Sequence, residues 1–343
     1  MMSYIARRLL ILPVILFGVS LLVFSMLMLI GPYKRLSTYI KSPAELKTAN
    51  LDTLVDKYGL NDPFYVQYSR WIKGVLQGDF GWSETAGQPV SKAILSRFPA
   101  TLELALLALI PVIMGGINLG VFSAVHHNDP WDHITRVFSI VGWSIPTFVF
   151  GLVVLMIFYG VLGWFPPGRL SVWAEDIIRS GEFIQYTHLN VIDGLLNGNL
   201  RVVGDALRHL IAPVISISIL WWAYILRITR SSMLETLRKD YIRTARSKGV
   251  KEKLVIKKHA RKNALIPVVT VAGFMVLGLL GGLVITETIF GYQGLGKFFA
   301  SAASQLDYAA VLGLALYFGF LLIIINLCVD VSYAIIDPRI RLE

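Results

Sequence analysis

The sequence predicts an all-α membrane protein that crosses the bilayer six times. The chain has 343 residues, of which 55% are hydrophobic, and a mean hydropathy of +0.64. Soluble domains of this length are rarely so apolar. The apolar residues are gathered into six long runs, and the basic residues lie mostly at the ends of those runs. That distribution is typical of a polytopic membrane protein.

Each of the six runs is long enough to form a membrane-spanning helix, which needs ~20 apolar residues at a rise of ~1.5 Å to cross ~30 Å of hydrocarbon. None contains Lys or Arg, and the only acidic residue in them is Glu103, near an end. The first run is longer than the ~7–15 residues of a signal-peptide core, so we interpret it as a retained span. The predicted spans are Leu9–Ile30, Leu102–Val125, Val137–Leu162, Leu210–Leu226, Leu265–Ile285 and Ala309–Val329.

The loop charges predict the orientation of the chain. Arg7 and Arg8 precede the first run and place the N-terminus in the cytoplasm. Six crossings return the C-terminus, with Arg339 and Arg341, to the same side. The net charge of +10 follows this loop pattern and does not form a basic patch with interleaved aromatic residues, so we expect no nucleic-acid binding.

The long polar segment Gly31–Thr101 is expected on the outer side. Ser42 as N-cap, Pro43 in the first turn and Gly59 as the stop predict a short helix. Phe64–Leu76 is amphipathic and aromatic, which favours a helix on the outer membrane surface. The segment is either an extracytoplasmic cap that docks a substrate-delivering protein or a packed loop that closes the helix bundle.

Small residues and one proline mark features inside the spans. Gly116 and Gly120 in the second run, and Gly278 and Gly282 in the fifth, have the spacing that lets two helix backbones approach closely. We expect these glycines to serve bundle packing rather than a pore gate. Pro146 interrupts the third run and predicts a kink there.

The sequence supports no metal site, nucleotide site or catalytic centre. His126–His133 contains three His and two Asp, but the spacing matches no metal-ligand pattern and a solvated loop is expected. Gly291–Phe298 resembles a phosphate-binding loop, yet Phe298 stands where that loop needs a hydroxyl. No metalloprotease or serine-hydrolase motif is present, and the single cysteine, Cys328, cannot form an intrachain disulfide.

The segment 230–263 is the strongest candidate for a specific function. It carries twelve Lys/Arg against three acidic residues and lies between two apolar runs. An apolar stripe with helical spacing, a glycine at 249 that can end a helix, and a second short basic helix predict a helix–glycine–helix unit under the bilayer. The unit either docks in a groove of a cytoplasmic partner or binds anionic lipid headgroups. The stripe consists of Leu234, Leu237, Tyr241 and Ala245.

At this segment the chain resembles the inner-membrane permease subunits of ATP-binding-cassette importers of the dipeptide, oligopeptide and nickel type. The stretch DYIRTARSKGVKEKLVIKKHARKNALIP is similar to that family's cytoplasmic EAA loop, with Arg243-Thr244-Ala245 in place of Glu-Ala-Ala. Further stretches fit in order along nearly the whole chain. They are RRLLILPVILFGVSLLVF, GLNDPFYVQYSRWIKGVLQGDFGWS, RFPATLELALLA, ETIFGYQGLGKFF and DVSYAIIDPRIRL.

The resemblance implies a type I importer permease fold and a non-catalytic role in a prokaryotic cytoplasmic membrane. Residues 1–31 would hold the first helix, 32–101 an extracytoplasmic insertion, and 102–343 a five-helix core. It further implies a second homologous permease, two ATPase subunits that bind ATP and Mg²⁺, and an extracytoplasmic binding protein; membrane lipid is a further partner, and this chain holds no cofactor. The coupling contacts to the ATPases would be Tyr241, Arg243, Thr244, Ala245, Gly249, Val250 and Lys253.

Substrate and energy source are less constrained. Related permeases carry short peptides or oligosaccharides, and Gly31–Leu36 departs from the usual segment of the peptide permeases, so both classes stay open. The substrate-binding residues are unknown. The alternative function is a secondary transporter or channel that works without an ATPase. The near absence of ionisable residues inside the spans argues against ion coupling.

Overall fold

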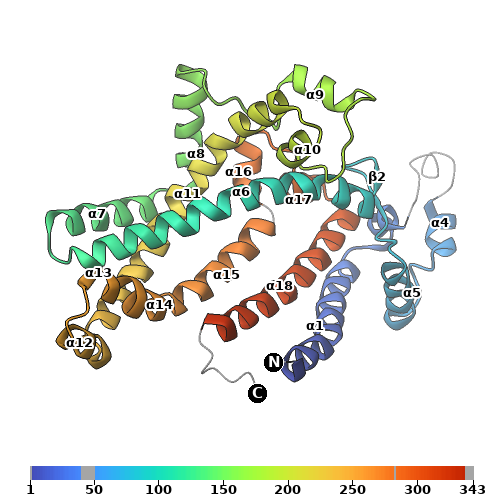
Figure 1. Cartoon of the computed structure of the whole chain (residues 1–343). Coiled ribbons are helices and arrows are strands. Elements are labelled where there is room, and N and C mark those ends of the chain that lie inside the picture. Colours follow the sequence, from blue (N-terminus) through green and yellow to red (C-terminus); the bar gives the residue numbers. More distant parts are fainter. Residues whose placement is uncertain (1, 40–50, 282, 337–343) are drawn as a thin grey trace.

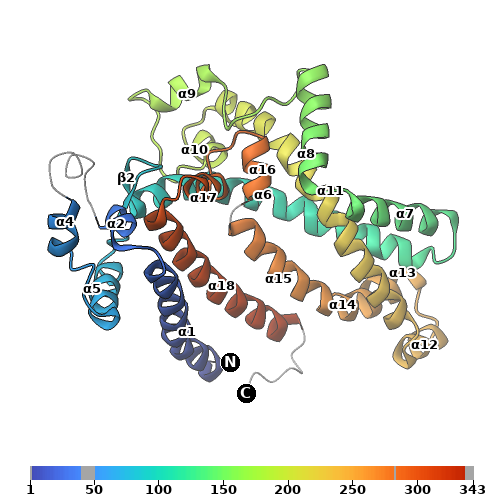
Figure 2. The same ribbon diagram turned by 180° about the vertical axis from the view of Figure 1, so that it is seen from behind.

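A computed structural model describes residues 2–39, 51–281 and 283–336 (Figures 1 and 2). The first part of the chain forms one long helix, several short helices and a small hairpin, and longer helices follow. In order they are α1 (Met2–Met28), α2 (Pro32–Arg35), η1 (Leu36–Thr38), α4 (Leu51–Lys57), α5 (Phe64–Leu76), β1 (Trp82–Ser83), β2 (Gln88–Pro89), α6 (Val90–Val125), α7 (Pro130–Ser144), α8 (Thr147–Leu155) and η2 (Met156–Val161).

The second part alternates long helices with short ones. These elements are α9 (Val172–Arg179), α10 (Asn190–Leu196), α11 (Leu200–Leu237), α12 (Asp240–Ser247), α13 (Glu252–Leu254), η3 (Val255–Ala260), α14 (Arg261–Ala264), α15 (Ile266–Leu280), α16 (Val284–Ile289), α17 (Leu295–Ser304) and α18 (Tyr308–Ile336). Apart from the two-residue strands β1 and β2, which pair antiparallel, every regular element in the described residues is helical. The predicted all-α class is confirmed.

The packing of α6 against α11 forms the centre of the molecule. The two helices have 36 and 38 residues, so at ~1.5 Å per residue each is over ~50 Å long and exceeds the ~30 Å of a bilayer core. A Cβ atom built on Gly116 would lie 2.7 Å from Ile225 Cβ, and one on Gly120 would lie 2.5 Å from Thr229 Cβ. These glycines therefore allow the close approach of α6 and α11 that their spacing predicts.

The second glycine pair behaves differently. A Cβ atom on Gly278 in α15 would meet nothing within 4 Å, and Gly282 lies outside the described residues. The prediction that this pair packs helices together is therefore wrong for Gly278 within the chain itself. Its face of α15 is open.

The remaining long helices lie around this centre. α7 packs on α11, where Ser139 Oγ donates a hydrogen bond to the Ala223 carbonyl at 2.6 Å. α15 contacts α6, α11 and α18, and α1 runs antiparallel to α18 (Figures 1 and 2). α12 lies at one end of the molecule, and α9, α10 and α17 lie toward the other.

Four helices in the described chain are long and apolar enough to cross a membrane, namely α6, α11, the Ile266–Ile289 stretch and α18. α7 and the helix that begins with α8 make a fifth if they count as one span, although they are bent by 100° at Ile145-Pro146. The kink at Pro146 is thus a sharp break, and the third predicted span is not one continuous helix. The apolar stretch Pro13–Met28 of α1 is shorter than the other spans, so the count of six crossings stays a prediction.

The segment after α1 folds back onto it. Tyr68 of α5 hydrogen-bonds Ser20 of α1 at 2.8 Å, and its ring contacts Phe24. Phe64–Leu76 is helical as predicted. Gly59 has a positive φ of 59°, in keeping with its predicted role as a helix stop. The predicted helix start at Ser42 and Pro43 lies outside the described residues.

Buried polar contacts fix this segment to the helices. The Arg35 guanidinium donates to Gln67 Oε1 at 2.7 Å and to the Leu60 carbonyl at 2.9 Å. Asp307, at the start of α18, accepts hydrogen bonds from Ser83 Oγ at 2.5 Å and from the Thr85 amide at 3.0 Å. Because Ser83 and Asp307 are both buried, the hairpin is tied firmly to α18.

Candidate functional site

The candidate site is the segment 230–263, at the α12 end of the molecule. α11 runs without interruption to Leu237, and α12 begins anew at Asp240. The chain then turns at Gly249, whose φ of 76° is left-handed, and continues through α13, η3 and α14. The order helix, glycine, helix is confirmed.

The predicted apolar stripe is confirmed only in part. Leu234, Leu237 and Ala245 pack in one buried cluster, but the stripe does not lie on a single helix, because the chain breaks between α11 and α12. Arg238 ends α11 and Lys239 has an extended backbone, so Leu234 and Tyr241 do not share one helix. Tyr241 is 43% exposed. The buried residues of α12 are Ile242 and Ala245. Sequence reasoning found Ala245 and missed Ile242, although their i, i+3 spacing carries the signal of a buried face.

Ile242 fixes α12 to the body of the protein. It is fully buried in a cluster with Ala124 of α6, Met233 of α11, and Val255 and Ala260 of η3. Burial of an Ile side chain stabilises by ~1.5–3 kcal/mol. α12 is therefore a short helix whose buried face packs on η3, in one cluster with residues of α6 and α11.

The other predicted site residues lie mostly on the opposite, exposed face of this unit. The side chain of Arg243 is 82% exposed and its contact with Asp240, at 3.9 Å, is long. Thr244 and Lys253 are exposed, Gly249 lies at the exposed turn, and Val250 is half-buried. Tyr241 Oη accepts a hydrogen bond from Asn263 Nδ2 at 2.9 Å. The structure thus gathers these residues on one unit, with Ala245 beneath them.

An ion pair closes the turn at Gly249. Arg246 Nε and Nη2 donate to the two carboxylate oxygens of Glu252 at 3.0 and 2.6 Å. The hydrogen bond from Arg246 lowers the pKa of Glu252, and the same bond raises the pKa of Arg246. Both side chains are about half exposed, so the pair contributes little stability but holds α12 and α13 in one orientation.

A second ion pair lies deeper, where α7 meets α11. Asp132 is fully buried and accepts from Arg230 Nε at 2.7 Å and from Arg230 Nη2 at 2.8 Å. Ser123 Oγ of α6 donates to the same carboxylate at 2.7 Å, and the Asn128 amide donates at 3.1 Å. Asp132 belongs to the His126–His133 stretch, so the expectation of a solvated loop is wrong for this residue. No group of three metal-ligating side chains occurs in the described part of the chain.

The Gly291–Phe298 stretch that resembles a phosphate loop is filled by the chain's own carboxylate. Glu287 Oε1 accepts from Thr101 Oγ1 at 2.7 Å, and Glu287 Oε2 accepts from the Lys297 amide at 2.9 Å. A Cβ atom on Gly294 would lie 2.5 Å from Glu287 Cδ, so the glycine is required for this approach. The loop binds an internal anion, which agrees with its rejection as a nucleotide site.

At the end that carries α9 and α10, Glu103 links α6 to the segment before α11. Its Oε2 accepts from Arg169 Nη2 at 2.8 Å, and its Oε1 accepts from the Val191 amide at 2.8 Å. Arg169 also donates to the His188 carbonyl at 3.1 Å. Glu103 is the acidic residue that the sequence places near the end of a span, and this pairing explains how it is buried.

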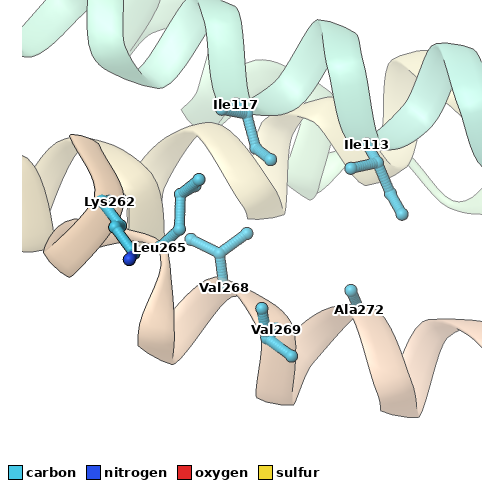
Figure 3. Close-up of a pocket in the computed structure, with 7 residues that line it drawn as sticks. All are labelled: Ile113, Ile117, Lys262, Leu265, Val268, Val269 and Ala272. Atoms are coloured by element: carbon cyan, nitrogen blue, oxygen red, sulfur yellow. The ribbon is translucent and has the colours of Figure 1, made fainter. Parts of the chain in front are cut away.

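A cavity of about 360 Å³ opens between α6 and α15. Figure 3 shows Ile113 and Ile117 above it, Val268 and Ala272 below it, and Lys262 at its edge. Its lining is otherwise apolar. It holds no convergent set of polar groups, and so it does not define a site for a polar substrate.

These features define a polytopic, all-α membrane protein that presents a basic, anchored helix at one end. A family model for the inner-membrane component of binding-protein-dependent transport systems matches residues 116–342. A companion model for the N-terminal part of that membrane component matches residues 1–105.

Full-length relatives agree with the family models. The dipeptide transport system permease protein DppB of Alkalihalophilus pseudofirmus is 38% identical over 99% of this chain and 100% of its own length. The oligopeptide transport system permease protein AppB of Bacillus subtilis is 39% identical over 99% and 100%. The di/tripeptide transport system permease protein DppB of Pseudomonas aeruginosa is 40% identical over 99% of each chain. The chain belongs to this family, the permease subunits of ATP-binding-cassette importers.

Proposed function

We propose that this chain is one half of a membrane pore that imports short peptides and is driven by partner ATPases. The observation that carries the proposal is α12: a short helix fixed by Ile242 on one face, with Arg243, Thr244 and Lys253 exposed on its unit. A helix that packs on η3, in one buried cluster with residues of α6 and α11, can transmit the movement of a partner to those two long helices. ATP and Mg²⁺ would be bound by the partners.

The proposed arrangement places α12 and both termini on the cytoplasmic side. The basic residues of segment 230–263 support this orientation. Residues 32–101 and the α9–α10 segment would then face outward and receive an extracytoplasmic binding protein. The five-helix core would lie in residues 102–343.

A second permease is supported by the open surface of the chain. Gly278 has empty space around it, and Phe274 on the same helix, α15, is 66% exposed. Small residues such as Gly278 permit close helix contacts when another helix is present. We propose that a homologous permease covers this face, so that the pore forms between two chains.

Peptide as the substrate rests on the relatives, whose names specify dipeptides, oligopeptides and di/tripeptides. The altered Gly31–Leu36 segment keeps oligosaccharides open as a second substrate class. A transport assay that offers a labelled dipeptide and a labelled oligosaccharide in competition decides between the two classes.

The partner assignment is tested by mild solubilisation of the tagged chain from native membranes and mass spectrometry of what co-purifies. We expect a second permease and ATPase subunits. The double variant Arg243→Glu, Lys253→Glu should lose the ATPases and keep the second permease. The matched control is Arg179→Glu, an exposed arginine at the other end of the molecule. Recovery of the native chain alone and active would instead support a secondary transporter.

A further inference from the structure

The buried ion pair between Asp132 and Arg230 joins three helices at the end of the molecule that carries α12. Asp132 lies in the first turn of α7, Arg230 on α11, and Ser123 on α6. Thr135 Oγ1 extends the network by donating to Ser123 Oγ at 2.9 Å. Each carboxylate oxygen of Asp132 therefore has at least two partners. Asp132 lies outside the sequence stretches that resemble the permease family.

The position of Arg230 on α11 places the ion pair close to the end of the helix that leads to α12. Arg230 lies about two helical turns before α11 ends at Leu237. Met233, on the next turn, belongs to the same buried cluster as Ile242 of α12, and η3 contacts both α11 and α12. A displacement of α12 is therefore passed through this cluster to the stretch of α11 whose Arg230 binds Asp132.

The link continues along α7 beyond the ion pair. Ser139 Oγ bonds the Ala223 carbonyl of α11 at 2.6 Å, and a Cβ atom on Gly142 would lie 3.1 Å from Ala223 Cβ. α7 is thus held on α11 from Asp132 up to the 100° break that precedes α8. A rigid contact of this length transmits movement only if the two helices do not separate.

We propose that Asp132 and Arg230 are positioning residues that make α7 follow α11 when α12 is displaced, so that partner movement reaches the broken helix α7–α8. The inference rests on the proposed function, because it needs an ATPase to move α12. The alternative is that the pair only stabilises the fold and has no part in coupling.

The first test uses Asp132→Asn and Arg230→Gln in the complete complex reconstituted in vesicles. The readout is the number of peptides transported per ATP hydrolysed, which a merely stabilising role would not change. We expect each variant to lower this ratio by roughly fivefold or more. The double variant should lose no more than the worse single variant, because both substitutions remove one interaction.

The matched control is Glu103→Gln, which removes a buried ion pair from the opposite end of α6. We expect it to leave the ratio near that of the native sequence. An equal loss in this control would overturn the proposal, since any buried pair would then have the same effect. ATP-independent uptake by the native complex would refute the proposed function itself, whereas ATP-driven uptake with an unchanged ratio in both variants would refute only the coupling role.

The second test works even if a charge-removing variant fails to assemble. Gly142→Cys with Ala223→Cys, in a Cys328→Ser background, places two cysteines where a disulfide can lock α7 to α11 with a small adjustment. We expect the oxidised protein to keep ATP-driven transport, and oxidation to restore the ratio in Asp132→Asn. Loss of transport on oxidation, reversed by reduction, would show that α7 and α11 must separate during transport and would contradict the proposal.

Discussion

Single residues set the geometry of the coupling segment. Gly249 turns the chain with a left-handed backbone, Ile242 anchors α12 in a buried cluster, and Arg246 forms an ion pair with Glu252 across the turn. The sequence indicated the glycine because a break between two basic helical stretches favours such a residue. The sequence could not indicate the ion pair between Arg246 and Glu252, because that contact depends on how sharply the chain turns.

The first residue-scale prediction concerns Gly249→Ala. A side chain in the left-handed region costs ~1–2 kcal/mol, while a Cβ atom at Gly249 would touch nothing within 4 Å. The loss should therefore be purely conformational and reduce the equilibrium constant between the seated and unseated states of α12 by a factor of ~5–30. Hydrogen exchange of the amides in α12 measures it. The control is Gly204→Ala, a helical position in α11 with open space, and equal protection in both variants would contradict the prediction.

The second residue-scale prediction concerns pH. The pKa of Glu252 is below its ordinary value of 4.5, so the ion pair stabilises the turn above that value, and the contribution is lost as the pH falls through the lowered pKa. Hydrogen exchange at the Gly249 turn, corrected for intrinsic rates, should increase on acidification below about pH 4. Glu252→Gln should abolish this dependence. A variant that keeps the same acid transition would assign the effect to another carboxylate.

At the scale of elements, the long helices were easier to predict than their ends. The second predicted span ends at Val125, as α6 does, but α6 begins at Val90 rather than Leu102. α11 extends beyond its predicted span at both ends. The additional turns are stabilised by neighbours such as α10 on α11 and α17 on α6, which local periodicity does not report. The break between α11 and α12 was missed because Arg238 and Lys239 are good helix formers and their sequence contains no stop signal.

An element-scale prediction follows from the two glycine pairs. Gly120→Leu should destabilise the isolated chain by ~1–3 kcal/mol, because the new side chain overlaps Thr229 and the Leu226 carbonyl. Gly278→Leu, the matched control, should leave the stability of the isolated chain unchanged but weaken co-purification of a second permease. Thermal unfolding in detergent and pull-down measure the two effects. Equal destabilisation by both variants would show that α15 packs within the chain.

At the scale of the whole molecule, α6 and α11 form a packed centre that extends from the α12 end to the α9–α10 end (Figure 1). The all-α class and the family were accessible from the sequence because they depend on composition and on contiguous motifs. The 100° bend at Ile145-Pro146 and the burial of Asp132 were not, because a proline predicts a kink without its angle and a lone aspartate does not indicate its partner. The remaining open faces are those expected to meet lipid or a second chain.

The central claim is that this chain is a permease subunit that hydrolyses no ATP itself and is driven by a partner ATPase through α12. The most direct measurement is uptake of a labelled dipeptide into vesicles that contain the complete complex, with native ATPases or with ATPases whose nucleotide site is disabled. We predict uptake that requires ATP, stops with the disabled ATPases, and falls with Arg243→Glu, Lys253→Glu. Uptake that continues at the same rate with disabled ATPases would contradict the claim and establish transport without ATP.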